Sequence, residues 1–157
     1  MRTCTLVLVS AALVGVMAAG TVVRAELKKG KITGHDLMVP ITVDSAKLAN
    51  GMTVRHTHQK GFTTGNEPGN PFDGACQDCF FSDVLAADGS VVSSTAHCQG
   101  VDRDGDTWSV VTGAKEGTWV FVGGTGKFKG IEGGGTYKID KEWPDGRALG
   151  SWEGSIK

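Results

Sequence analysis

The chain has 157 residues, 24 of them glycine, and a formal net charge of −1 at neutral pH. This charge balance offers no basic surface for nucleic acid or anionic lipid, so neither is expected as a partner of the mature protein. No long stretch of Leu, Ala, Glu and Lys recurs at helical spacing, whereas Val, Thr and Ser are common. This composition favours an all-β protein of short strands and tight turns.

Residues 1–25 have the features of a secretory signal peptide. A basic residue precedes an apolar stretch over Leu6–Ala19, and small residues lead to an expected cleavage after Ala25, with cleavage after Ala19 as the alternative. The apolar stretch is too short to span a bilayer. Residues 26–157 are then expected to form one secreted or periplasmic domain without a membrane anchor.

The first part of this domain predicts strands and one long loop. Asp36–Val43 is strand-like, and Pro40 favours an edge or kinked strand there. Asp44–Asn50 is expected to form one helical turn. Met52–Gln59 alternates like a strand with two distinct faces, whereas Thr64–Gly74 carries two prolines and three glycines and is expected to be a loop.

Two further strands, Cys76–Ala87 and Ser90–Gly100, are joined by Asp88-Gly89, a strong signal for a two-residue hairpin loop. Counting back from this loop places Cys79 opposite Cys98, at a hydrogen-bonded position of the ladder. In an exported chain we expect these two cysteines to form a structural disulfide that contributes about 3 kcal/mol. A one-residue bulge would instead favour Cys76 as the partner of Cys98, and either pairing leaves one thiol over.

The C-terminal half alternates strands and turns. Asp102–Asp106 is expected to be a solvated hairpin turn, because its glycine does not match the spacing of an EF-hand. The glycine-rich stretch Val122–Tyr137 predicts a tight barrel corner, since glycine adopts positive φ at little cost. Phe128 after Lys127 excludes a phosphate-binding P-loop. Strands are expected over Trp108–Val111, Gly117–Val122, Thr136–Asp140 and Arg147–Ile156, with a last turn at Pro144–Gly146.

The segment Trp119–Tyr137, W-V-F-V-G-G-T-G-K-F-K-G-I-E-G-G-G-T-Y, resembles the strand, glycine corner and returning strand of the allene oxide cyclase and dirigent barrels. Gly105-Asp106 before Trp108 resembles the Gly-Asp-aromatic sequence that precedes this corner in the cyclases. Small secreted bacterial proteins share the same pattern. The resemblance covers the last third to half of the chain. It implies an eight-stranded antiparallel, calycin-like barrel that is commonly a homotrimer with an apolar cavity, and it carries over no catalytic residue.

Three functions are compatible with these features. The first is binding of a small apolar or phenolic molecule without a cofactor, with cyclase or isomerase activity left open; its expected contacts are His97, Trp119, Phe121, Tyr137 and Trp152. The second is an envelope metal or redox protein in which His56 and His58, on one strand face, bind zinc or copper together with His97 and the remaining thiol. The third is a structural or interaction module that binds no small ligand.

Overall fold

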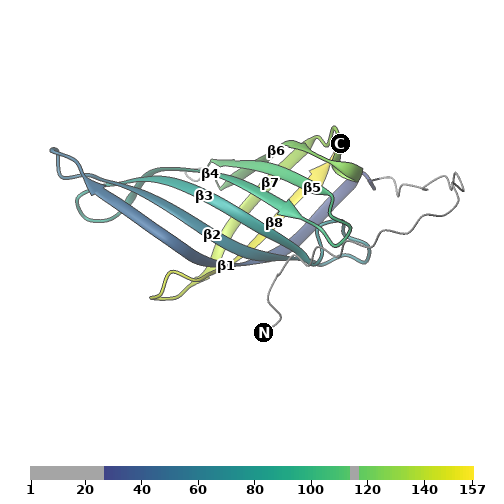
Figure 1. Cartoon of the computed structure of the whole chain (residues 1–157), viewed down its shortest axis with the longest axis horizontal. Coiled ribbons are helices and arrows are strands. Elements are labelled where there is room, and N and C mark those ends of the chain that lie inside the picture. The colour runs from purple at the N-terminus through teal and green to yellow at the C-terminus, as the bar shows by residue number, and fades with distance from the viewer. Residues whose placement is uncertain (1–26, 114–116) are drawn as a thin grey trace, which may run out of the picture.

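The computed structural model describes residues 27–113 and 117–157, which form a closed barrel of eight antiparallel strands in chain order (Figure 1). The prediction of an all-β, eight-stranded barrel is confirmed. The predicted signal peptide lies outside the described residues, among which no helix has the length and apolarity to cross a membrane. The strands are β1 (Gly30–Lys47), β2 (Thr53–Gly65), β3 (Ala75–Leu85), β4 (Val91–Val101), β5 (Thr107–Gly113), β6 (Thr118–Gly124), β7 (Gly133–Glu142) and β8 (Ala148–Ile156).

The first strand differs from its prediction. β1 continues as far as Lys47, so the helical turn expected over Asp44–Asn50 does not form. Pro40 is accommodated because the register between β1 and β2 shifts between Pro40 and Thr42, which marks a bulge. The chain then reverses around Gly51, which has a φ of 83°. This irregularity at Pro40 agrees with the kinked strand that the sequence predicted there.

The β3–β4 hairpin reaches the predicted pairing by a different route. Its loop is one residue longer than predicted, since the amide of Ala86 donates to the carbonyl of Ser90 (2.8 Å). A compensating bulge follows in β4. Leu85 pairs with Val91, but the next pair is Val84 with Ser93, so one residue of β4 has no partner in β3. The two irregularities cancel, so Cys79 faces Cys98 and the predicted disulfide is confirmed. The Cα atoms are 4.1 Å apart, which corresponds to a narrow, non-hydrogen-bonded pair rather than the wide pair that we predicted.

The predicted glycine corner connects β6 to β7 through a 3₁₀ turn, η2 (Gly126–Phe128). Gly126 has a φ of +56°, and a Cβ atom there would overlap the carboxylate of Asp106. Gly124 has no left-handed φ, but a Cβ atom on it would lie 2.6 Å from the Cβ atom of Phe128. Close packing at both positions, and backbone conformation at one of them, therefore require glycine at the corner.

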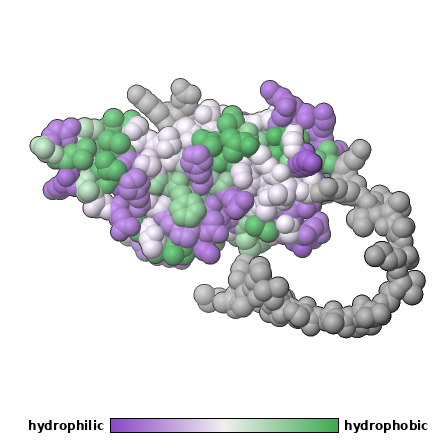
Figure 2. All heavy atoms as spheres, turned by 45° about the horizontal axis from the view of Figure 1, so that its top comes forward, coloured by the Kyte–Doolittle hydropathy of each residue, from purple (hydrophilic) through white to green (hydrophobic). Residues whose placement is uncertain are grey.

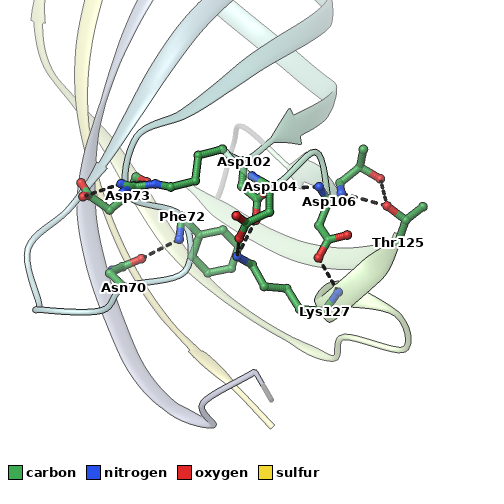
Figure 3. Close-up of polar contacts among 10 residues, drawn as sticks. Asn70, Phe72, Asp73, Asp102, Asp104, Asp106, Thr125 and Lys127 are labelled. Atoms are coloured by element: carbon green, nitrogen blue, oxygen red, sulfur yellow. Dashed lines mark hydrogen bonds and ion pairs between the residues drawn. The ribbon is translucent and has the colours of Figure 1, made fainter. Parts of the chain in front are cut away.

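The neighbouring turn, Asp102–Asp106, is a hairpin turn as predicted, with Arg103, Asp104 and Gly105 exposed, but its first residue is not solvated. Asp102 is buried and accepts hydrogen bonds from the amides of Asp104 (2.8 Å) and Asp106 (3.0 Å). Nζ of Lys127, from the glycine corner, lies 2.5 Å from Asp102 Oδ2 and 3.0 Å from Asp104 Oδ2 (Figure 3). This ion-pair network holds the β4–β5 turn and the β6–β7 connection together at one end of the barrel.

Candidate functional site: the barrel interior

The barrel encloses a cavity of about 700 Å³, a volume typical of small-molecule sites. Phe72, in the loop between β2 and β3, closes one end of it. At the other end the lining residues Val43, Val91 and Ile139 are 56%, 57% and 56% exposed, which places the opening there. The cavity therefore has a closed aromatic floor and an open mouth.

Aromatic residues of β6, β7 and β8 form much of the wall. Trp119, Phe121, Tyr137 and Trp152 all line the cavity. The indoles of Trp119 and Trp152 pack edge to face, with ring centroids 6.4 Å apart. Glycines on adjoining strands make room for both indoles: a Cβ atom at Gly34 would lie 2.3 Å from Trp152, and one at Gly154 would lie 2.4 Å from Trp119.

His97 does not belong to this wall. It is paired with Phe80 across the β3–β4 ladder, and both side chains lie exposed on the outer surface. Their neighbours in the ladder, Phe81 and Cys98, line the cavity, because successive residues of a strand point to opposite faces. The expectation that His97 contacts a ligand inside the barrel is therefore corrected.

The residues considered for a metal site are also dispersed. His56 is exposed, and Nε2 of His58 lies 2.7 Å from Asp78 Oδ1 while its ring stacks on Phe80 at 4.4 Å. Cys76 pairs with Phe62 and Val101, at a different height on the barrel from the histidines. Over residues 27–113 and 117–157, no group of three His, Cys, Asp or Glu side chains is arranged to hold a metal ion. The second function thus gains no support from the geometry.

A half-buried acid that the sequence did not reveal lies in the cavity wall. The carboxyl of Asp36 on β1 accepts a hydrogen bond from the indole nitrogen of Trp152 (3.2 Å). Burial raises the pKa of Asp36, while the nearby side chains of Thr63, Gln77 and Trp152 act in the opposite direction and do not cancel it. Asp36 therefore holds a proton more tightly than a free aspartate does, and in its protonated form it can donate a hydrogen bond inside the barrel.

A second polar group lies on the neighbouring strands β2 and β3, opposite Tyr137. Nε and Nη2 of Arg55 both donate to Oδ2 of Asp83, at 2.9 and 2.8 Å, and Asp83 is buried. Tyr137 lies on β7, four strands away from β3 in the ring and hence on the opposite wall. Burial raises the pKa of Tyr137 and the charge of Asp83 adds to this, so the two groups are close enough to interact.

The sequence contained a partial signal for these polar residues. The alternation of β2 separates Arg55, Thr57 and Gln59 from the two histidines, and all three line the cavity. The sequence could therefore have predicted that β2 contributes polar side chains to the cavity. Asp83 and Asp36 could not be found in the same way, because their neighbours across the barrel depend on the register of distant strands.

A closed eight-stranded barrel with a ligand-sized, largely apolar interior defines the class of this protein. No family model matches the sequence, and no curated protein matches it either. Among solved structures, the chain resembles the pterocarpan synthase dirigent protein PsPTS1 at a TM-score of 0.53 and 16% identity, over 83% of this chain and 96% of that one. The pterocarpan synthase dirigent protein GePTS1 gives a TM-score of 0.53 and 15% identity, over 83% of this chain and 85% of that one. The protein thus has a dirigent-like barrel fold.

Proposed function

We propose that the barrel binds a small apolar or phenolic molecule in its internal cavity. The observation that carries the proposal is a cavity of about 700 Å³ in which aromatic walls surround Asp36, an acid whose pKa is raised by burial. Apolar walls supply affinity, while a few fixed polar groups select and orient a ligand. The solved structures of similar fold include pterocarpan synthase dirigent proteins, which agrees with a small-molecule role but does not identify the ligand.

The polarity of the cavity also suggests an orientation. A phenolic hydroxyl or a carbonyl oxygen would accept a hydrogen bond from the neutral carboxyl of Asp36. The apolar remainder of the molecule would lie against Phe121, Trp152 and the floor, because the mouth contains charged lining residues, Lys138 and Glu142 among them.

Tryptophan fluorescence can test this proposal, since two of the lining indoles report on occupancy. We expect 4-propylphenol to change the emission of the purified protein at micromolar to millimolar concentrations and to bind more tightly than propylbenzene, which lacks the hydroxyl. Asp36→Ala should remove this preference, and Trp119→Ala should weaken binding of both probes. His97→Ala, on the outer surface, is the matched control and should change neither. Failure of every apolar and phenolic probe to bind would refute the proposal.

We also propose acid–base chemistry of the isomerase or cyclase type on the bound molecule. A carboxyl kept neutral by burial can stabilise charge that develops on a substrate oxygen, and the carboxylate of Asp83 supplies a base in the same cavity. Isomerisation of 3-cyclohexenone to its conjugated isomer, followed by ultraviolet absorbance, is a suitable probe. Asp36→Asn should abolish turnover while the protein still binds 4-propylphenol. Equal rates for both proteins would exclude Asp36 as the acid.

The outer wall supports a proposal of self-association. Val120 and Val122 on β6 are exposed and apolar, as is Phe80 on β3 (Figure 2 shows such apolar patches on one face). We propose a homotrimer, to be tested by light scattering on the eluting protein. The double variant Val120→Ser, Val122→Ser should lower the measured mass if this wall is the interface.

We propose in addition that the protein is exported, because the Cys79–Cys98 disulfide is typical of an oxidising compartment. Mass spectrometry of the protein recovered from its own host should show a chain that begins at residue 26. An intact N-terminus in the mature protein would contradict this.

A further inference from the structure

The loop over residues 66–74 separates two hollows at the closed end of the barrel. Phe72 alone of this loop lines the internal cavity. Its neighbours Asn70, Pro71 and Asp73 line a second, smaller hollow, together with exposed residues such as Lys28 and Arg103. One side chain therefore lies between the cavity and the surface of the loop.

The ring of Phe72 is only 3% exposed and fills the end of the cavity. It packs against three other lining residues, with ring centroids 5.4 Å from Trp108, 5.6 Å from Phe121 and 6.1 Å from Trp152. On its far side it stacks on Phe128 at 5.4 Å, which is fully buried and does not line the cavity. Phe72 is thus the innermost layer of a two-layer floor.

The backbone of the loop is held by contacts that do not involve this ring. The amide of Phe72 donates to Oδ1 of Asn70 (3.0 Å; Figure 3), and Nδ2 of Asn70 donates to the carbonyl of Thr33 (3.0 Å). Glu67 accepts from the hydroxyl of Thr33 (2.5 Å) and from its amide (3.1 Å). Asp73 accepts from the amide of Gly65 (3.1 Å). Shortening the side chain of Phe72 should therefore enlarge the cavity without releasing the loop.

We infer that Phe72 is a specificity-determining residue that sets the length of the molecule the cavity accepts. The inference rests on the proposed function, because it requires a ligand whose apolar end points to the floor. That direction follows from polarity: the floor is aromatic throughout, whereas at the mouth the charged residues Lys138, Glu142 and Asp145 accompany the apolar ones. Trp152 contacts both Asp36 (3.2 Å) and the ring of Phe72 (centroids 6.1 Å apart), so a ligand held at Asp36 lies beside the floor, and the ring of Phe72 limits how far its apolar part extends there.

A series of 4-alkylphenols from ethyl to decyl tests the inference, with dissociation constants measured by tryptophan fluorescence and by the rise in melting temperature. In the natural protein, affinity should rise by up to about fourfold for each added methylene that becomes buried, and should then stop rising or fall. In Phe72→Ala and in the milder Phe72→Leu, short members should bind no better than before. The optimum should move to longer chains, and Phe72→Ala should move it further than Phe72→Leu.

Phe128→Leu is the matched control, since it removes similar buried surface from the same aromatic stack but does not line the cavity. Its optimum should stay at the natural chain length. An optimum unchanged in both Phe72 variants, with binding retained, overturns the inference and leaves the proposed function standing. Absence of binding by every member to every protein overturns both. Should Phe72→Ala fail to fold, Phe72→Leu decides between these outcomes.

Discussion

The indole nitrogen of Trp152 donates a hydrogen bond to Oδ1 of Asp36 inside the barrel, although the two residues are 116 positions apart in the chain. They meet because β1 pairs with β8 and closes the barrel, which brings Gly34 opposite Trp152. The absence of a side chain at Gly34 lets the indole lie over β1 and reach the carboxyl. Closure of the barrel thus creates the most distinctive polar contact of the cavity.

The first prediction concerns the pH dependence that Asp36 imposes. Because burial raises its pKa in the folded state, the folded protein holds this proton more tightly than the unfolded chain does. The stability that this proton gives the folded protein is complete below the ordinary pKa of an aspartate and is lost as pH rises through the raised pKa. The loss is about 1.4 kcal/mol for each tenfold difference in proton affinity between the folded and unfolded states. Asp36→Asn should therefore raise the melting temperature at pH 7, and the gain should shrink toward pH 4. A gain that is equal at both pH values would contradict the buried, protonated acid.

The second prediction concerns the disulfide. Replacing Cys79 or Cys98 by Ser should lower the free energy of unfolding by about 3 kcal/mol, because the crosslink restricts the unfolded chain, yet the barrel should still form. Urea unfolding gives the free energies, and peptide mapping without reductant gives the pairing. A linked peptide that contains Cys76 and Cys98 would show that the hairpin register is wrong.

The third prediction concerns the glycine corner. Gly124→Ala should cost about 1–3 kcal/mol through overpacking against Phe128, and Gly126→Ala should cost at least as much, because it adds backbone strain to a clash with Asp106. Gly113→Ala is the matched control: its φ is not left-handed, and the nearest atom to a Cβ there is 3.6 Å away. Gly117 is unsuitable as a control because its φ is +58° and a Cβ would lie 2.8 Å from the carbonyl oxygen of Tyr137. Equal thermal melts for all three variants would mean that the corner is not tightly packed.

The fourth prediction concerns the anchor of the floor loop. Hydrogen bonds from Thr33, with that of Asn70, lower the pKa of Glu67 from its ordinary 4.5 to about 2. A lowered folded-state pKa contributes stability above the ordinary value, and this stability is lost as pH falls toward about 2. Glu67→Gln should therefore be less stable than the natural protein at pH 6, and the difference should narrow toward pH 2. Thermal melts across this range measure it, and a constant difference would show that the carboxylate of Glu67 is not the anchoring group.

The amino-acid sequence by itself determined the strand content, the glycine corner, the pairing of Cys79 with Cys98 and the inward direction of Trp119 and Trp152. These features depend on the alternation of residues within a strand, on turn residues and on the register of a hairpin, all of which are determined by residues close together in the chain. The hairpin shows the limit of such counting, since the loop length was predicted wrongly and a bulge at the following pair restored the expected register.

Only the tertiary structure decided which polar residues share the cavity. Asp36 acquires its partner Trp152 from a strand 116 positions away, and Asp83 meets Arg55 through the register of β2 and β3. Phe72 acquires its role because a loop folds back into the end of the barrel. His97 shows the converse: it was expected to contact a ligand in the cavity, yet the alternation of β4 turns Cys98 inward and His97 outward. Strand alternation fixes that two faces exist, whereas closure of the eight strands decides which face is the interior.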